Sequence, residues 1–241
     1  MNTEIENRLI DCVRQFYTEN KEAIENENVI ITRPYIPYIP DEWSNILLLA
    51  EAQNLSTKYQ SYVDKLNNQT EEQLFKRLDD PRNLGILPWD DNSLKIAVEA
   101  GMHTDYRKVG VSNACFWSIR DDGGANANPT ANMQTLSTNL WNRIFKIISP
   151  RVVITVGDVA HNIINASTYK GKHGNLCHPS SSYLSKFSNL VDESLILEKF
   201  PEIKTLDEMH PKWMVRGHYR QNKLFYAMHT ISRLRNLEIE Q

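Results

Sequence analysis

The fold is decided by the stretch Asn45-Ile46-Leu47-Leu48-Leu49-Ala50-Glu51-Ala52-Gln53-Asn54. Its large aliphatic residues and the alanine after them form a short run that is apolar on both faces, which is typical of a strand in a parallel sheet covered by helices. The run ends at the carboxylate of Glu51, in a small polar turn. Ligands of open α/β sheets bind outside the carboxyl ends of the strands, so Glu51 is a candidate site residue.

Two later segments repeat this pattern. Lys108–Asn113 is a short apolar segment that places the amide of Asn113 at a strand end, and Arg151–Gly157 is a third apolar strand that ends in glycine. We therefore predict an α/β fold, a three-layer α/β/α sandwich with a mostly parallel central sheet. The strands expected in this sheet are Ile46–Ala50, Val109–Ser112 and Val152–Val156.

The remaining chain predicts helices and connections around this sheet. Apolar residues at three-four spacing indicate helices, and glycine, proline and asparagine clusters indicate loops. Arg33 to Pro40 contains the repeated unit Tyr-Ile-Pro and predicts an extended lead-in to the first strand. Arg120 to Asn132 predicts a long loop, and a Gly/Lys/His-rich connection precedes Asn175. The predicted helices are Glu4 to about Glu25, Thr57 to about Leu78, Asn92 to Gly101 with Asn92 or Asp91 as cap, Thr135 to Ile148, Asp158 to Ile164, and a helix within His210 to Asn236.

Length and composition predict one soluble domain. The 241 residues suit a single domain over 1–241, with a helix and lead-in in 1–44 and a basic helix in 201–241 packed on the domain. No apolar run approaches the ~20 residues of a membrane span, and the polar amino terminus has no signal core, so we expect a cytoplasmic monomer. Cys12, Cys115 and Cys177 make neither a disulfide framework nor a four-thiolate metal site. The net charge of −3 argues against an indiscriminately basic nucleic-acid binder but allows a local basic patch.

Three features together resemble the uracil-DNA glycosylase superfamily, especially its branch whose first motif reads Gly-Glu-Ala-Pro-Gly. Ala50–Asn54 occupies that motif, Ser112-Asn113 resembles the strand-end asparagine that pairs with the target base, and His178-Pro179-Ser180 matches the His-Pro-Ser loop. Pro150–Ala160 is similar to the strand and helix that precede this loop. The resemblance covers roughly Asn45 to Leu184 and implies hydrolysis of the bond between a flipped-out base and its deoxyribose in DNA.

The sequence also departs from that family. Ala50, Gln53 and Asn54 stand where the branch has glycine, proline and glycine, and its cluster-binding cysteines have no counterparts. We therefore expect no iron–sulfur cluster, no other cofactor and no metal. Uracil is the default substrate by resemblance, but the altered motif leaves room for another modified base, including bases of modified viral DNA.

The chemistry of base removal assigns a role to each candidate residue. The transition state has a positively charged sugar and an anionic leaving base, so Glu51 is the expected carboxylate near the sugar and His178 the expected donor near the base. Asn113 is expected to read the polar edge of the base, and Trp89 or Phe116 to stack on its face. The loop with Asp90 and Asp91 carries rival catalytic carboxylates. Ala52 and Gln53 are the other expected base-binding residues.

DNA contacts are expected from the loop after His178 and from the carboxyl-terminal helix. Serine hydroxyls can hold phosphates, an apolar or aromatic side chain can fill the vacated stack, and cations can contact the backbone. The residues assigned to phosphates are Ser180, Ser182, Arg216, Arg220, Lys223, Arg233 and Arg235, and the wedge is Tyr183 or Leu184.

Simpler interpretations compete with these roles. Glu51 can be a helix-capping or surface acid, Asn113 a loop-fixing hydrogen bonder, His178 a structural histidine and Trp89 a core residue. A catalytically silent DNA- or nucleotide-binding module would keep the basic face without needing Glu51. A small-molecule enzyme is disfavoured because no Gly-rich phosphate loop follows the first strand. The sequence leaves open which base is removed, from single- or double-stranded DNA, and in repair or defence.

Overall fold

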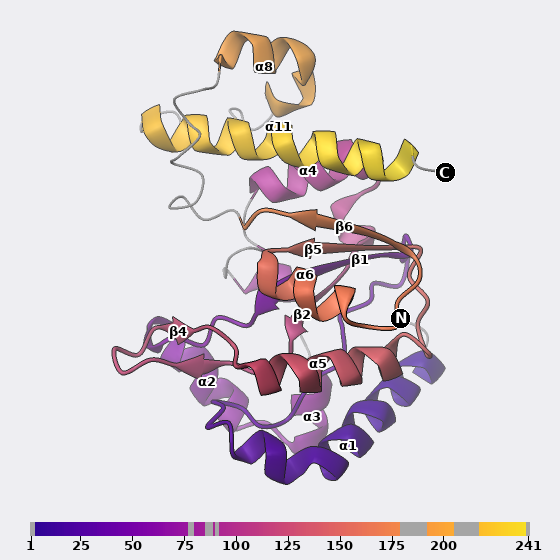
Figure 1. Cartoon of the computed structure of the whole chain (residues 1–241), viewed down its shortest axis with the longest axis vertical. Helices are drawn as coiled ribbons and strands as arrows, with labels where there is room; N and C mark the ends of the chain where they lie inside the picture. Colours follow the sequence, from indigo (N-terminus) through magenta and orange to yellow (C-terminus); the bar gives the residue numbers. More distant parts are fainter. Residues whose placement is uncertain are drawn as a thin grey trace. The chain divides into compact units, whose positions relative to one another are not determined.

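The computed structural model describes residues 3–76, 80–84, 89, 92–178, 192–204 and 217–239 (Figure 1). The chain forms two compact units, one made of Met1–Leu84 with Val109–Asn175, the other of Gly85–Lys108 with Leu176–Gln241. Each unit is therefore built from two separate stretches of sequence. A single domain over 1–241 stays a prediction.

The first unit contains a four-stranded sheet, a two-stranded hairpin and the helices around them. Its α-helices are α1 (Thr3–Glu25), α2 (Gln60–Asn67), α3 (Glu71–Lys76), α5 (Ala131–Ile144) and α6 (Asp158–Asn165). Its strands are β1 (Ile46–Ala52), β2 (Gly110–Cys115), β3 (Ile119–Arg120), β4 (Asn126–Ala127), β5 (Val152–Val156) and β6 (Lys172–Leu176). Its 3-10 turns are η1 (Thr57–Tyr59) and η2 (Pro81–Asn83).

The four-stranded sheet is parallel and has the order β2-β1-β5-β6. In the register of β1 with β2, Leu48 lies opposite Val111 and Ala50 opposite Asn113, and on the other side Leu48 lies opposite Ile154 of β5. The predicted α/β class with a mostly parallel central sheet is confirmed, and the arrangement is consistent with the predicted three-layer α/β/α sandwich.

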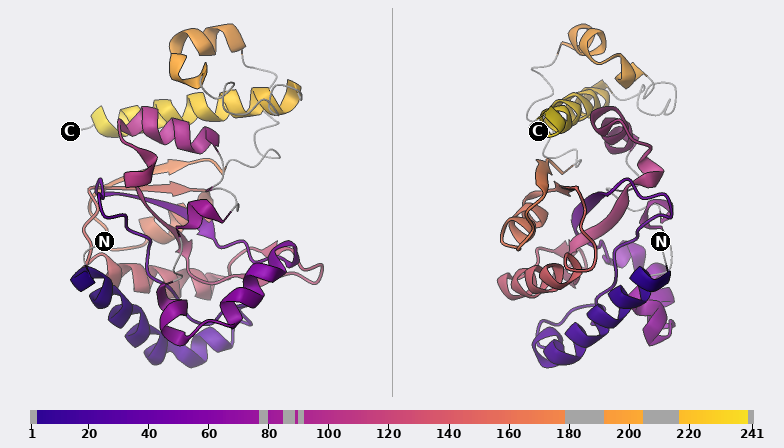
Figure 2. Two further views of the ribbon diagram at one scale, coloured as in Figure 1. Left: turned by 180° about the vertical axis from the view of Figure 1, so that it is seen from behind. Right: turned by 90° about the vertical axis from the view of Figure 1, so that its right-hand side faces the viewer.

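The core of the first unit explains why these strands form. All five residues Ile46 to Ala50 are buried, as the continuous apolar run predicts for a central parallel strand. Leu47 and Leu49 pack with α5 and α6 on one face of the sheet, and α1 packs against α5 beyond them (Figures 1 and 2). The predicted amino-terminal helix is confirmed, because α1 buries the apolar stripe that carries Leu9, Val13 and Phe16.

The prediction of one helix from Thr57 to about Leu78 is wrong in one respect, because the helix is interrupted between α2 and α3. The break has a capping box: the side chain of Gln73 accepts from the backbone N–H of Thr70 at 2.9 Å, and the Thr70 hydroxyl accepts from the N–H of Gln73 at 3.3 Å. These two bonds start α3 as a new helix.

Two more corrections concern connections. The stretch predicted as a long loop from Arg120 to Asn132 contains the hairpin of β3 and β4, and α5 begins already at Ala131 because Thr130 caps it by accepting from the N–H of Met133. The stretch predicted as a Gly/Lys/His-rich connection contains the edge strand β6. Four of its five residues are half-buried and polar or glycine, so no apolar run marks the strand.

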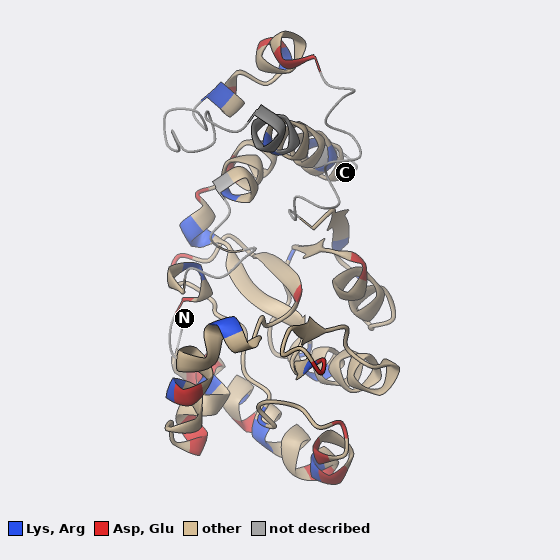
Figure 3. Ribbon diagram, turned by 90° about the vertical axis from the view of Figure 1, so that its left-hand side faces the viewer, with Lys and Arg blue, Asp and Glu red and all other residues tan. Residues whose placement is uncertain are grey.

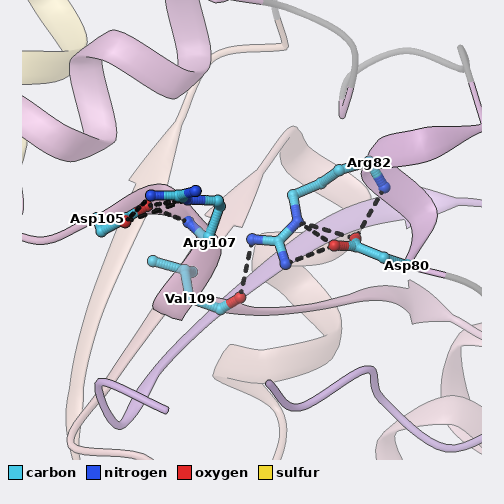
Figure 4. Close-up of polar contacts among 5 residues, drawn as sticks. All are labelled: Asp80, Arg82, Asp105, Arg107 and Val109. Atoms are coloured by element: carbon cyan, nitrogen blue, oxygen red, sulfur yellow. Dashed lines mark hydrogen bonds and ion pairs between the residues drawn. The ribbon is translucent and has the colours of Figure 1, made fainter. Parts of the chain in front are cut away.

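A half-buried ion pair fixes the chain at the start of β2 (Figure 4). The Arg82 guanidinium donates from Nε to both oxygens of Asp80, at 2.8 and 2.9 Å, and from Nη1 to the carbonyl of Val109 at 3.3 Å. It also lies over the Tyr38 ring, 5.4 Å from its centroid. One side chain therefore ties η2, β2 and the extended lead-in together.

The second unit is helical and has its own core. Its elements are α4 (Asn92–Met102), η3 (Tyr106–Lys108), α8 (Glu193–Lys199), η5 (Pro201–Ile203) and α11 (Gly217–Ile239). Its core includes Ile96 and Ala97 of α4 with Leu224 and Ile231 of α11. Figure 4 also draws the pair of half-buried Asp105 and exposed Arg107, in which Arg107 lowers the pKa of the Asp105 carboxyl to about 2.

Gly101 does not end α4, contrary to the prediction from sequence, since the helix continues to Met102. A β-carbon at Gly101 would lie 2.6 Å from Cβ of Leu234. The glycine therefore serves the close approach of α4 and α11. The residue that follows the helix is His103, whose φ of 47° is left-handed, and the chain leaves the helix there.

We expect Gly101→Ala to lower the free energy of unfolding by about 1–3 kcal/mol, because overpacking against Leu234 outweighs the gain of about 1 kcal/mol in helix propensity. Urea denaturation measures this. Gly123→Ala, in the exposed β3–β4 turn, is the control, and we expect its stability to change by less than about 0.5 kcal/mol. Equal or higher stability of Gly101→Ala would contradict the close contact of the two helices.

Candidate functional site

The candidate site lies at the carboxyl ends of β1 and β5. With the order β2-β1-β5-β6, the chain leaves β1 towards β2 on one side and leaves β5 towards β6 on the other. The connections that follow these two neighbouring strands therefore run in opposite directions, and such a switch point is where open parallel sheets bind ligands. Glu51 and Gly157 stand at this point.

Glu51 is fixed by the start of α6. Its Oε1 accepts a hydrogen bond from the backbone N–H of Val159 at 3.2 Å. Gly157 precedes the helix with φ of 98°, and a β-carbon there would lie 2.5 Å from Glu51 Oε1. Only glycine combines this left-handed backbone with room for the carboxylate. The partial positive charge of the helix start favours an anion at this place.

The carboxylate keeps one oxygen available. Within the described residues, Oε2 of Glu51 makes no hydrogen bond, and no lysine or arginine forms an ion pair with the side chain. Glu51 is also the only acidic residue in the four described strands of the sheet, which are nearly free of charged residues (Figure 3). One oxygen is thus anchored, and the other can bind water or a polar ligand.

Asn113 lies in the carboxyl-terminal half of the neighbouring strand β2, which continues to Cys115 and so past the predicted strand end at Ser112. It is buried and is the register partner of Ala50, so alternation along the strands places its side chain on the face opposite to that of Glu51. Its Oδ1 accepts a hydrogen bond from the hydroxyl of Tyr35 at 2.8 Å. A ligand that meets both Glu51 and Asn113 has to lie across the strand ends.

The loop after β1 is held by the β3–β4 hairpin. Asn126 of β4 accepts from the N–H of Leu55 at 2.9 Å and donates to the carbonyl of Gln53 at 3.0 Å, and Arg120 of β3 donates to the carbonyl of Leu55 at 2.7 Å. The Gln53 side chain donates to the hydroxyl of Tyr62 at 2.9 Å. These bonds hold the loop in one conformation, although it lacks the glycines and the proline of the Gly-Glu-Ala-Pro-Gly motif that it resembles. Sequence reasoning missed the hairpin, for which Gly123-Gly124 was a turn signal.

A polar cluster beside the site was also missed. The Thr155 hydroxyl of β5 lies 3.0 Å from Nε2 of His173 and 3.2 Å from Oδ1 of Asn175, both on β6. The rings of His173 and of His161 in α6 lie with their centroids 5.0 Å apart and their planes inclined by 30°. Nδ1 of His161 is buried without a hydrogen bond. A single polar residue inside an apolar strand, Thr155, was the available signal.

Three predicted contact residues lie buried. Phe116 is 2% exposed, and its ring stacks on Trp141 with centroids 5.3 Å apart, so it is a core residue and offers no open face to a base. Trp89, in the second unit, is 7% exposed. Lys223 is 3% exposed, which corrects the prediction that it belongs to a solvent-facing basic surface of the last helix.

The other predicted residues are distributed as follows. Ala52 ends β1 and packs against the core. His178 is half-buried and belongs to the second unit, so its meeting with Glu51 and Asn113 stays a prediction. In that unit Arg235 pairs with Glu202, and Arg233 is exposed. Outside the described residues lie Asp90, Asp91, Ser180, Ser182, Tyr183, Leu184, Arg216 and the side chain of Arg220.

Comparison with known proteins adds no relative: no model of a protein family matches the sequence, and no curated protein is significantly similar to it. No three His, Cys, Asp or Glu side chains of the described chain gather as a metal site would require. None of the described helices is both long and apolar enough to span a membrane. Function therefore has to be argued from the site.

We expect the free energy of unfolding to decrease as the pH is lowered, because His173 is buried in its neutral form. Burial, and to a lesser extent His161, lowers its pKa from 6.5 to about 4. The unfolded chain therefore takes up this proton at higher pH than the folded chain, so the contribution of neutral His173 is complete above pH 6.5 and is lost as the pH falls towards 4. Urea denaturation of the wild type and of His173→Gln between these pH values should show a shallower decline in the variant.

His103→Asn is the matched control, because it removes an exposed histidine and asparagine tolerates the left-handed backbone there. This variant should keep the pH dependence of the wild type. If stability declines equally with falling pH in the wild type and in His173→Gln, the His173 imidazole does not cause the decline.

Proposed function

We propose that the protein is a DNA glycosylase that hydrolyses the bond between a flipped-out uracil, or another modified base, and its deoxyribose, leaving an abasic site. One observation carries this proposal: the only acidic side chain of the sheet, Glu51, stands at the switch point with one carboxylate oxygen anchored and the other available. The resemblance of Ala50–Asn54, Ser112-Asn113 and His178–Ser180 to the uracil-DNA glycosylase superfamily supplies the reaction.

Glu51 is the proposed catalytic carboxylate. As the bond to the base breaks, positive charge develops on the sugar, and a fixed carboxylate stabilises that charge without having to reorganise. The N–H of Val159 and the glycine at position 157 keep the carboxylate in one place. Its second oxygen can orient the attacking water. Asp90 or Asp91 takes this role if the loop that carries them closes over the same site.

The base is proposed to lie across the strand ends, with its polar edge at Asn113. His178 would donate to the departing base, whose negative charge needs a hydrogen-bond donor. Gln53 belongs to the held loop next to Glu51 and remains a candidate base contact. Trp89 remains the candidate stacking residue, since the ring of Phe116 is occupied by the core.

DNA is the proposed partner, held by local positive charge. Ser180, Ser182 and Tyr183 remain proposed backbone contacts and wedge, and Arg216, Arg220 and Arg233 remain proposed phosphate contacts, whereas buried Lys223 is withdrawn from this set. A monomer acting in the cytoplasm belongs to the same proposal. A site that accepts enlarged bases would suit defence against modified viral DNA.

A second candidate function is favoured by one observation. Glu51 accepts from the first turn of α6, which is what a purely structural capping acid also does. A catalytically silent DNA- or nucleotide-binding module with this fold would show binding to DNA without release of a base. An assay for base release separates the two functions.

We expect the purified protein to release a base from DNA that carries uracil, damaged bases or naturally modified viral bases. Alkaline cleavage of abasic sites and mass detection of the free base measure the reaction. Glu51→Gln should slow release by at least ~10²-fold, because the charge is lost. Its stability should fall by less than about 1.5 kcal/mol, because the amide oxygen can still accept from Val159. His178→Ala should slow release to a similar extent.

The matched control is Glu27→Gln. Glu27 is also an acid that contacts the start of a helix: its carboxylate accepts from the side chains of Thr130 and, at 2.7 Å, of Asn132 at the start of α5. The substitution should therefore affect stability but not base release. Full activity of Glu51→Gln would remove Glu51 from the mechanism. Loss confined to Asp90→Asn or Asp91→Asn would move the catalytic carboxylate to that loop.

A further inference from the structure

A cavity of about 320 Å³ lies at the edge of the sheet opposite to Glu51. Its walls come from the carboxyl end of α5, from the residues that precede β5 and from those that precede β6 (Figure 1). Because the strands are parallel, β5 and β6 both begin at the amino-terminal edge of the sheet. All the lining residues belong to the first unit. The cavity is therefore separate from the candidate site, and its volume suits a small molecule.

One wall of this cavity is aromatic and held in place. The ring of Tyr169 lies against that of Phe145, with centroids 5.0 Å apart. The Tyr169 hydroxyl donates towards two backbone carbonyls, that of Pro150 at 3.1 Å and that of Lys172 at 3.2 Å. A β-carbon at Gly171 would lie 2.1 Å from the hydroxyl oxygen, so a glycine at this position leaves the space that the ring occupies. The wall is therefore preformed and offers apolar surface to a flat ring.

Asn142 contributes hydrogen-bond donors to the same cavity. Its Oδ1 accepts a hydrogen bond from the backbone N–H of Thr168 at 2.6 Å. A backbone N–H can only donate, so this bond fixes which end of the amide carries the oxygen. Asn142 is half-buried and lines the cavity, and no described residue accepts from its Nδ2. The N–H groups of Nδ2 are therefore available to a ligand.

Two lysines add positive charge to the cavity. Lys146 and Lys170 line it and are exposed, and within the described part of the chain neither forms an ion pair. From Lys146 to Lys172 the sequence has a single acid, Asp158, which starts α6 beyond the other end of β5. Lys146 also complements the partial negative charge at the carboxyl end of α5. That role accounts neither for Lys170 nor for the donor of Asn142.

We propose that this cavity binds a nucleoside 5′-phosphate. Donors without acceptors and cations without carboxylates favour an anionic group that only accepts hydrogen bonds, and a phosphate monoester carries about −1.5 to −2 charges on three accepting oxygens. The flat ring of a base suits the aromatic wall of Phe145 and Tyr169. A free nucleotide and the 5′-phosphorylated end of a DNA strand share this chemistry. The inference concerns the other edge of the sheet and does not rest on the proposed function.

Isothermal titration calorimetry with the four 2′-deoxynucleoside 5′-monophosphates tests the site. The tightest of them should bind at least ~10-fold more strongly than inorganic phosphate and than its own nucleoside, because wall and donors act on one molecule. Asn142→Asp keeps an oxygen that accepts from Thr168 but replaces the donor by a charged acceptor, so the affinity should fall by at least ~10-fold. Urea denaturation checks that this variant stays folded. Lys146→Gln combined with Lys170→Gln should weaken binding and flatten its dependence on salt.

Asn128→Asp is the matched control, because it makes the same change of charge at an exposed asparagine of the same unit. Asn128 precedes the amino end of α5, whereas the cavity lies at the carboxyl end. The helix separates the two positions by about 20 Å, which is more than the distance over which salt screens charges. The nucleotide affinity of this variant should stay within about twofold of the wild type.

A 5′-phosphorylated trinucleotide distinguishes the two sources of the ligand. Affinity equal to that of the mononucleotide identifies a DNA end, weaker binding identifies a free nucleotide, and both results support the inference. Two outcomes would overturn it: no mononucleotide that binds more tightly than inorganic phosphate, or equal affinity in the wild type and Asn142→Asp. Base release is measured separately and should persist in Asn142→Asp. Nucleotide binding without any release therefore removes the proposed function alone, and release without nucleotide binding removes this inference alone.

Discussion

A carboxylate at the end of a buried strand needs hydrogen-bond donors, and the first turn of α6 supplies one to Glu51. A charged group of this kind contributes on the order of 1.5–3 kcal/mol when its bond is made and costs as much when it is not. The contact requires a glycine at position 157, where β5 turns into α6. The carboxyl ends of β1 and β5 are therefore held against each other, and the loops of the candidate site begin at positions that this contact fixes.

The sequence predicted the parts of the fold that local patterns determine. Val152–Val156 was predicted to the residue, because a strand buried on both faces has to be apolar throughout. The edge strand β6 was missed because half-buried positions accept lysine, histidine and glycine. The break between α2 and α3 was readable in Thr70 and Gln73, but the surrounding helix-forming residues outweighed this signal.

The site shows a similar division. Glu51 and Asn113 were predicted from their places at strand ends, which is a local property. Their partners were not, because Tyr35 lies 78 residues from Asn113 and Val159 lies 108 residues from Glu51. Hydrogen bonds across such separations depend on the tertiary fold, and no spacing in one sequence indicates them. The same limit applies to the hairpin that holds Gln53.

The second unit joins helices that are far apart in the chain. Ile96 and Ala97 of α4 find their apolar partners in α11, and the chain between the two helices includes most of the sheet. On the ribosome, α4 therefore emerges long before α11 and keeps an uncovered apolar face while β2, α5, β5 and α6 are being made. During that interval the nascent chain offers a binding surface to chaperones, and slow elongation there prolongs its exposure to aggregation.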